Sequence, residues 1–274
     1  MNVDIEKELK DKVVVITGGG GILCSEMAKA FAKYKSKVAV LDLYKEKTEK
    51  VVEEIKNNGG QAIGIGANVL DKESLEKAKE IILDTFGTVD ILINGAGGNH
   101  ESATTSSEKT FFDLNIDDIS KVFNLNFLGT VLPSQIFGKI MAEKKKGIII
   151  NISSMAAIRP LTRTIAYSAA KAAVSNFTQW LAVYMNQEYS PHIRVNAIAP
   201  GFIITDQNRY LLIDKETGDL TQRGRNVINA TPMGRFGMPS DLIGIVLFLC
   251  SESASFINGA IIPVDGAFSA YSGV

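Results

Sequence analysis

The sequence has few of the residues that mark several common classes of protein. Its 274 residues include two cysteines, two histidines and one tryptophan, and the formal net charge is -1. Two cysteines are too few for a disulfide framework, and His100 and His192 have no cysteine nearby in the sequence that would complete a zinc site. A net charge near zero supplies no overall positive field for nucleic acid or an anionic membrane. We therefore expect no nucleic-acid partner and no metal centre.

Long hydrophobic runs are also missing. The longest, such as Leu242 to Cys250, are roughly half as long as the ~20 residues that a membrane span requires. The first residues, MNVDIEKELKDK, contain no apolar segment that could serve as a signal peptide. The sequence thus predicts a cytoplasmic protein with no membrane partner, in which residues 1–10 form a short extension before the first strand.

Short runs rich in valine and isoleucine recur along the chain, separated by longer segments with helical periodicity. The runs are nearly continuously apolar, as strands buried on both faces of a parallel sheet are. They cover Val13 to Ile16, Val38 to Leu41, Ala62 to Ile65, Val89 to Ile93, Ile148 to Ile152, Ile193 to Ile198 and Ile261 to Val264. A helix is expected over 72–86, with Asp71 as its N-cap and Gly87 closing it. The alternation predicts an α/β fold with a doubly wound parallel sheet, and the lack of a linker or repeat favours a single domain over residues 1–274.

Two segments without clear periodicity interrupt this pattern. The polar loop HESATTSSEK, residues 100–109, follows the fourth predicted strand, and loops at the carboxyl ends of strands commonly build binding sites. A solvated surface loop is an equally compatible interpretation. Residues 205–231 are too many for a simple connection, which makes them a candidate lid over a ligand.

Four consecutive glycines end the first predicted strand, in the stretch VVVITGGGGILCS. A strand, a glycine-rich turn and a helix N-terminus together present backbone N–H groups to a phosphate. The spacing is not that of the dinucleotide motif G-x-G-x-x-G, because its third glycine falls on Leu23 or Cys24. A tight turn without a ligand is the alternative interpretation.

Asp42 makes a dinucleotide site the stronger interpretation. It ends the second predicted strand, 24 positions after Gly18, near the ~20-residue spacing at which an acidic side chain reaches the ribose hydroxyls. A carboxylate there repels the extra phosphate of NADP, so the sequence predicts NAD as the cofactor. Lys45 and Lys47 are close enough in the sequence to weaken this discrimination, and a purely structural role of Asp42 in starting a turn is the alternative.

The segment IAYSAAKAAVSNFTQW, residues 165–180, places Tyr167 and Lys171 on one face of a helix, four positions apart. An ordinary tyrosine, with a pKa near ~10, is a poor acid–base group at neutral pH. A neighbouring ammonium lowers that pKa toward the working range. Taken alone, the pair also fits a packed tyrosine beside a solvated lysine.

Five short motifs occur in order along the chain: Thr17-Gly18, NGAG at 94–97, NISS at 151–154, Tyr167 with Lys171, and RVNAIAPG at 194–201. Together they resemble the short-chain dehydrogenase/reductase family over nearly the whole chain. The resemblance implies a single Rossmann-type domain with a parallel sheet of about seven strands, binding of NAD and assembly into a homotetramer.

The resemblance also implies roles for individual residues. Tyr167 matches the family's proton donor or acceptor, and Lys171 matches the residue that lowers its pKa and holds the nicotinamide ribose. Ser154 matches the serine that orients the substrate oxygen, and Asn126 the asparagine that supports a proton-relay water. Besides Tyr167 and Lys171, the residues expected to contact the cofactor are Gly18, Gly20, Gly21, Ile22, Leu23, Asp42, Leu43, Asn68, Val69, Asn94, Ala96, Gly97, Pro200, Gly201, Ile203 and Thr205.

The chain departs from the family pattern at four positions. The family's T-G-x-x-x-G-x-G motif places its last two glycines on Ile22 and Cys24, so Gly19 to Gly21 are expected to give the diphosphate its close approach. Gly95 replaces the second asparagine of N-N-A-G, and Asn68 stands where the family has an aspartate beside the adenine. A helix N-terminus can lower the pKa of a thiol, yet we interpret Cys24 as a packing residue.

Longer segments, among them NGAGGNH and residues 153–183, resemble the family members that reduce a hexuronate to an aldonate. Such a sugar-acid substrate carries a carboxylate, which requires a cation or several hydrogen-bond donors. Arg159 and His100 are the first candidates and Arg163 follows, with Ser154 at the reacting oxygen; a surface charge is the alternative for each cation. An aldonate dehydrogenase of the gluconate 5-dehydrogenase type and an NAD-sensing regulator without turnover are the other functions to weigh. The intact acid–base residues argue against the regulator.

Overall fold

Seven parallel strands form the central sheet of the computed structural model, which describes residues 4–205 and 209–273. Their order across the sheet is β3-β2-β1-β4-β5-β6-β7. Their bounds are β1 (Val13–Thr17), β2 (Lys37–Asp42), β3 (Gln61–Gly66), β4 (Ile91–Asn94), β5 (Gly147–Ile152), β6 (Ile193–Pro200) and β7 (Ile261–Val264). Each predicted run falls on one of these strands, so the parallel α/β sheet is confirmed.

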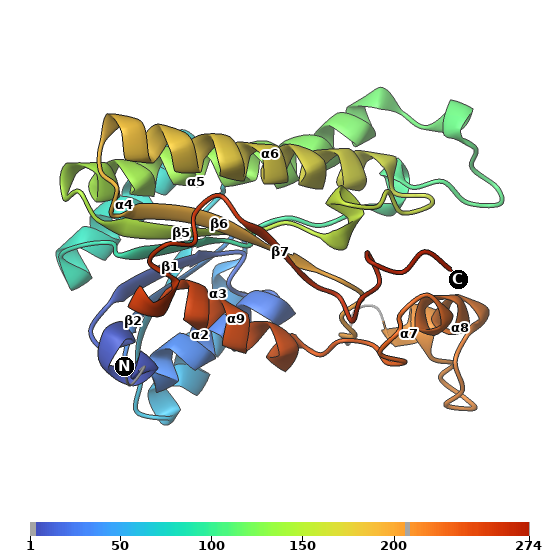
Figure 1. Ribbon diagram of the computed structural model, residues 1–274, viewed down its shortest axis with the longest axis horizontal. Coiled ribbons are helices and arrows are strands. Elements are labelled where there is room, and N and C mark those ends of the chain that lie inside the picture. Colours follow the sequence, from blue (N-terminus) through green and yellow to red (C-terminus); the bar gives the residue numbers. More distant parts are fainter. Residues whose placement is uncertain (1–3, 206–208, 274) are drawn as a thin grey trace.

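Helices cover both faces of the sheet (Figure 1). One face carries α2 (Ile22–Lys33), α3 (Lys45–Asn57) and α9 (Ile243–Leu249), and the other carries α4 (Lys72–Phe86), α5 (Ile116–Glu143) and α6 (Ile165–Glu188). The shorter helices are α1 (Ile5–Leu9), α7 (Arg209–Leu212) and α8 (Gln222–Asn229). In Figure 1, α7 and α8 lie together at the right, beyond the carboxyl ends of the strands. This is the predicted Rossmann-type single domain.

Side chains that alternate along each strand fill two hydrophobic cores. In β1, Val14 and Ile16 pack with α2, α3 and α9, whereas Val13 and Val15 pack with the helices of the opposite face. All four side chains are almost completely buried. Because both faces are covered, the strands read as continuous apolar runs rather than as an apolar–polar alternation.

Helix α4 has the predicted bounds because both of its ends are set locally. Oδ1 of Asp71 accepts a hydrogen bond from the N–H of Glu73 at 2.9 Å, which satisfies one of the free donors of the first turn. Gly87 has a φ of 81°, in the left-handed region that favours glycine at the end of a helix.

The predicted N-terminal extension is partly built into the domain. Helix α1 lies within it, and Leu9 is fully buried in the core of the α2 face. Residues 1–3 of this extension, and residues 206–208 of the predicted lid, lie outside the described residues. In the part of the chain that the structure describes, no helix combines the length and the apolar character needed to cross a bilayer.

The strand order places a binding crevice at one edge of the sheet. β1 lies between β2 and β4, so the chain leaves β1 toward one side of the sheet and later returns to its other side. In doubly wound folds, ligands bind beyond the carboxyl ends of the strands at this reversal. The predicted site residues that end β1, β2, β4 and β6 therefore share one edge.

Candidate functional site

The glycine-rich turn between β1 and α2 packs tightly against its surroundings. Gly18 has a φ of 63°, and a Cβ at this position would lie 2.8 Å from the Cα of Ala96. A Cβ on Gly20 would lie 2.6 Å from the Cβ of Lys47. Real Cβ atoms do not approach other atoms so closely, so the fold itself requires glycine at both positions.

Helix α2 begins directly after this turn, with Gly21 as its N-cap. Gly21 offers no side-chain acceptor to the N–H groups of the first helical turn. Such N–H groups, together with the positive end of the helix dipole, favour an anion. Ile22 and Leu23 are the first helical residues and contribute this part of the backbone. A turn without side chains at the start of a helix fits the diphosphate of a dinucleotide.

The carboxylate of Asp42 joins the end of β2 to the glycine turn. Oδ2 accepts a hydrogen bond from the N–H of Gly20 (3.2 Å), and Oδ1 accepts one from the N–H of Tyr44 (3.2 Å). Asp42 thus starts a local turn and also contacts the glycine turn. Each oxygen has a further lone pair for a ribose hydroxyl. Leu43, the next residue, is exposed.

Thr17 holds the turn that follows β4. Its Oγ1 accepts hydrogen bonds from two successive N–H groups, the first of them that of Gly95 at 3.2 Å. A Cβ on Gly97, two residues later, would lie 2.5 Å from Oδ1 of Asn126 and 3.3 Å from Nζ of Lys171. The NGAG segment therefore connects the end of β1 to two of the predicted catalytic side chains.

Asn94, at the start of this segment, belongs to a buried amide and hydroxyl network. Its Nδ2 donates to Oγ of Ser134 and to Oδ1 of Asn151, both at 2.9 Å. Nδ2 of Asn151 donates in turn to Oγ1 of Thr178 at 2.9 Å. The network links β4 and β5 to α5 and α6, so the side chain of Asn94 acts within the protein interior. The sequence analysis did not identify its partners on the two helices.

Asn126 on α5 binds both backbone groups of one residue, Gly98, in the loop after β4. Its side chain is fully buried. Oδ1 accepts from the N–H of Gly98 (3.1 Å), while Nδ2 donates to the carbonyl oxygens of Gly98 (2.7 Å) and Val122 (2.8 Å). The amide therefore fixes the backbone at the base of the polar loop, a contact that the sequence analysis missed.

Ser154, Tyr167 and Lys171 come together at the carboxyl end of β5. Ser154 lies near enough to the hydroxyl of Tyr167 to lower its pKa. Nζ of Lys171 donates to the carbonyl oxygen of Ile152 at 2.7 Å and lies 5.6 Å from the ring centroid of Tyr167. Lys171 is buried and Tyr167 is half-buried. The helical spacing correctly predicted that the lysine and the tyrosine lie side by side.

The protonation of this group differs from the prediction. Burial raises the pKa of Tyr167 above its ordinary value, and the interaction with Ser154 opposes this only in part. The net shift of this pKa is therefore upward, opposite to the direction that the sequence predicts. Burial also lowers the pKa of Lys171 from an ordinary 10.5 to about 8. Desolvation of the charged form is the largest cause of both shifts.

Lys171→Met is expected to stabilise the fold at neutral pH. The pKa of Lys171 falls from 10.5 to about 8 on folding, so below pH 8 the folded state carries the full penalty of a buried ammonium. This penalty is on the order of 3 kcal/mol and disappears as the pH rises toward 10.5. After allowance for the lost hydrogen bond to Ile152, we expect Tm at pH 7 to rise by about 5 °C.

Thermal melts of the two proteins between pH 7 and 10 would measure this effect, and the gain should shrink as the pH rises. Lys50→Met removes an exposed ammonium and is the matched control. A lower Tm of Lys171→Met at pH 7 would mean that the hydrogen bond to Ile152 outweighs the cost of burial.

The remaining predicted cofactor residues lie along the same edge of the sheet. Asn68 and Val69 follow β3. Oδ1 of Asn68 accepts from the N–H of Leu70 at 3.0 Å, and Val69 is buried. The others end or follow β6: Pro200, Gly201, Ile203 and Thr205.

Two of the predicted substrate-binding side chains, His100 and Arg159, are exposed. Nδ1 of His100 lies 2.8 Å from Oγ of Ser102, which fixes the orientation of the ring. Arg159 follows the 3-10 turn Met155–Ala157, whose N-cap is Ser154. Both side chains therefore extend from segments that adjoin the predicted acid–base group.

Arg163 lies in a different place. It lines a cavity of about 440 Å³ together with Ser168 and Ala172 of α6, and Tyr167 does not line this cavity. The carbonyl oxygen of Arg163 also accepts a hydrogen bond from the N–H of Thr105 at 3.0 Å, so this residue contacts the polar loop that follows β4. Within the described residues, no group of three or more His, Cys, Asp or Glu side chains is placed to hold a metal ion.

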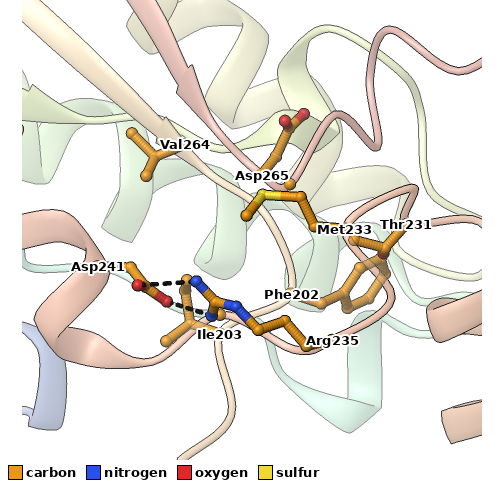
Figure 2. Close-up of a pocket in the computed structure, with 10 residues that line it drawn as sticks. Phe202, Ile203, Thr231, Met233, Arg235, Asp241, Val264 and Asp265 are labelled. Atoms are coloured by element: carbon orange, nitrogen blue, oxygen red, sulfur yellow. Dashed lines mark hydrogen bonds and ion pairs between the residues drawn. The ribbon is translucent and has the colours of Figure 1, made fainter.

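A second cavity, of about 190 Å³, borders the segment after β6 (Figure 2). Arg235 and Asp241 line it and form a bidentate ion pair with N–O distances of 2.7 and 3.0 Å. Between them in sequence, Gly237 donates to the carbonyl oxygen of Phe202 (3.0 Å) and accepts from the N–H of Ile204 (2.8 Å). The ion pair therefore supports the segment that carries the last predicted cofactor residues. The sequence analysis did not identify this support.

Comparison with known proteins gives consistent matches over the whole chain. A family model described as short chain dehydrogenase matches residues 12–216. The crystal structure of a candidate D-mannonate oxidoreductase from Haemophilus influenzae with bound NAD is 50% identical, with a TM-score of 0.93, and the match covers 98% of this chain and 99% of that one. The uncharacterized oxidoreductase UxuB of Bacillus subtilis is 49% identical over 281 residues, which is 99% of this chain and 100% of that protein. A 7α-hydroxysteroid dehydrogenase complexed with NADH and 7-oxo glycochenodeoxycholic acid is 31% identical, with a TM-score of 0.85 and 97% of each chain covered.

Proposed function

The chain belongs to the short-chain dehydrogenase family, and we propose that it is an NAD-dependent oxidoreductase that interconverts a sugar-acid ketone and its alcohol, namely D-fructuronate and D-mannonate. The observation that carries this proposal is the contact of Tyr167 with Ser154 beside a buried Lys171. The glycine turn and Asp42 support NAD as the cofactor, and so does the relative with bound NAD at 50% identity. We propose D-mannonate as the alcohol because that relative is a candidate D-mannonate oxidoreductase.

The acid–base group performs the proton transfer of this reaction. Bound NADH supplies the hydride that reaches the carbonyl carbon of the substrate. The hydroxyl of Tyr167 donates its proton to the carbonyl oxygen, while Oγ of Ser154 donates a hydrogen bond to the same oxygen. The ammonium of Lys171 stabilises the phenolate until solvent returns a proton. A raised pKa of Tyr167 suits this direction, because it keeps the hydroxyl protonated before the reaction.

Other residues act by holding the cofactor or the substrate. The backbone N–H groups of Ile22 and Leu23 face the diphosphate, and Asp42 accepts from the adenosine ribose. Asn126 acts through the backbone that it clamps at Gly98, in addition to the proton-relay role that the family implies. The carboxylate of the substrate is bound from the segments that carry His100 or Arg159, and α7 and α8 form the lid.

A substrate panel tests this assignment. The purified protein is assayed with NADH and NADPH against D-fructuronate, D-tagaturonate, 5-ketogluconate and neutral ketoses. We expect turnover of D-fructuronate with NADH and little turnover of neutral ketoses. Turnover of 5-ketogluconate alone would replace the proposal by the gluconate 5-dehydrogenase type, and NADH binding without turnover of any compound would favour the regulator.

The ion pair behind the cofactor segment gives a further expectation. An ion pair this exposed contributes little to stability, so Arg235→Ala should lower Tm by no more than about 3 °C. It should nevertheless raise KM for NADH roughly fivefold with a smaller change in kcat, because Gly237 no longer holds Phe202 in place. Lys77→Ala breaks the exposed pair with Glu73 on α4 and is the matched control. An unchanged KM would show that the pair does not support the site.

A row of exposed aromatic residues on α6 supports the homotetramer that the family implies. Trp180 is 56% exposed and stacks on Tyr184, with ring centroids 5.0 Å apart. Val183, also exposed, lies between them in sequence. Apolar side chains of this size gathered on one helix face are typical of a contact between subunits. Sedimentation equilibrium should give four times the mass of the chain, and a monomer at micromolar concentration would contradict the proposal.

A further inference from the structure

The side chain of Cys24 fills the space beside Gly95, between the first turn of α2 and the end of β4. A Cβ on Gly95 would overlap Sγ of Cys24 and would lie 3.0 Å from the carbonyl oxygen of Thr17. Cys24 is 5% exposed, so little water reaches this space. Only one of the two positions can therefore carry a side chain in this packing.

These two positions are also two of the departures from the family pattern. The family has glycine at the position of Cys24 and asparagine at the position of Gly95. We propose that the two departures are a single exchange: the helix, rather than the strand end, supplies the side chain that packs here, and Cys24 is a positioning residue for the turn at 95–97. Glycine at both positions would leave a void, and a side chain at both positions would give a steric overlap.

The position of this turn matters to the acid–base group. Gly95 donates its N–H to Oγ1 of Thr17 at 3.2 Å. Two residues later, the backbone of Gly97 approaches Asn126 and Nζ of Lys171 so closely that no Cβ fits. A displacement of the turn by a fraction of an ångström therefore reaches the lysine and the clamped loop.

The thiol itself acts as an apolar group. Burial raises the pKa of Cys24 to about 12, against the opposing effect of the nearby charge of Lys171. The sulfur is thus protonated at any physiological pH and is a poor nucleophile. This agrees with the prediction of a packing residue and excludes the thiolate that a helix N-terminus can favour.

A double-mutant cycle tests the exchange. The variants are Cys24→Gly, Gly95→Asn and the two together, and Tm is measured without cofactor. Each single change should lower Tm by about 5 °C or more, through a cavity or an overlap. The double variant should recover most of the summed loss, although glycine in the helix keeps a cost of up to about 1 kcal/mol. Strictly additive losses, or a Cys24→Gly variant as stable as the parent, would overturn the proposal.

Two further arms keep the test decisive. If Gly95→Asn does not fold, Gly95→Ala takes its place, and recovery of folding in the double variant counts as support. Cys250→Ala, at the other buried cysteine, should lower Tm but combine additively with Gly95→Ala, so recovery there would contradict a specific pair.

The affinity for NADH, from fluorescence titration, gives the readout of positioning. This part rests on the proposed function. Cys24→Gly should weaken NADH binding roughly tenfold, and the double variant should return to within about threefold of the parent. Equal weakening in both variants would reduce Cys24 to a structural residue. If the parent itself does not bind NADH, the proposed function fails, whereas the Tm cycle still decides whether the two positions are exchanged.

Discussion

Tyr167→Phe is expected to abolish turnover, with kcat lowered by roughly 10³-fold. The phenyl ring keeps the packing of the tyrosine beside Lys171, but it loses the hydroxyl that contacts Ser154 and provides the proton. Binding of NADH and Tm should change little, because the removed group is one hydroxyl. Initial rates, NADH titration and a thermal melt measure the three quantities.

Tyr184→Phe is the matched control for this variant. Tyr184 lies on the same helix, and its ring packs edge-on against that of Tyr189 with the centroids 5.8 Å apart. Removal of the Tyr184 hydroxyl should leave kcat unchanged. Substantial residual activity of Tyr167→Phe would exclude the phenol as the acid and would require another proton donor near the carbonyl.

Asp42→Asn is expected to remove most of the preference for NADH over NADPH. The ratio of the two kcat/KM values should change by roughly 10²-fold, because the carboxylate no longer repels the 2′-phosphate. Lys45 and Lys47 follow closely, and Nζ of Lys47 lies 4.9 Å from the ring centroid of Tyr44. These cations are positioned to attract a phosphate once the negative charge is absent.

Asp42→Ala separates charge from structure in the same experiment. Asparagine keeps one acceptor oxygen for the backbone N–H groups that Asp42 binds, whereas alanine keeps none. The alanine variant should therefore show the same loss of preference with an additional fall in Tm of a few degrees, on the order of 1 kcal/mol per lost hydrogen bond. A parent enzyme that prefers NADPH, or an asparagine variant with an unchanged ratio, would contradict this interpretation of Asp42.

The strands and α4 could be predicted because their signals are local. Strands such as β1 are apolar at every position but the last, and α4 has a capping aspartate before it and a glycine at its end. The bounds of helix α5 were not predicted from the sequence. Its buried face carries Asn126, Thr130 and Ser134, each 5% exposed or less. Because these buried positions are polar, the apolar period of this helix is hidden.

The site was predicted where spacing along one element decides the geometry. The four-residue separation of Tyr167 and Lys171 is such a case. The ion pair of Arg235 with Asp241 was missed. It supports the site only through the hydrogen bonds of Gly237 with Phe202 and Ile204, which lie more than thirty positions away in the sequence.

The pKa of Tyr167 was predicted in the wrong direction because burial is a tertiary property. In the same way, sequence alone presented Cys24 and Gly95 as two unrelated departures. The contact between their side-chain positions shows that the two departures are coupled.

The Asn94–Asn151 contact has a consequence for how the chain reaches this fold. These residues are direct partners at the ends of β4 and β5, after Ile91, Leu92 and Ile93 face Ile148, Ile149 and Ile150. Side chains so alike would bury nearly the same apolar area if one strand slid by two residues along the other, so hydrophobic burial barely distinguishes the alternatives. The amides do distinguish them, because a slide by two residues would break the buried hydrogen bond from Asn94 to Asn151. Two asparagines thus select the correct alignment at the centre of the sheet, and with it the spacing of the loops that carry the chemistry.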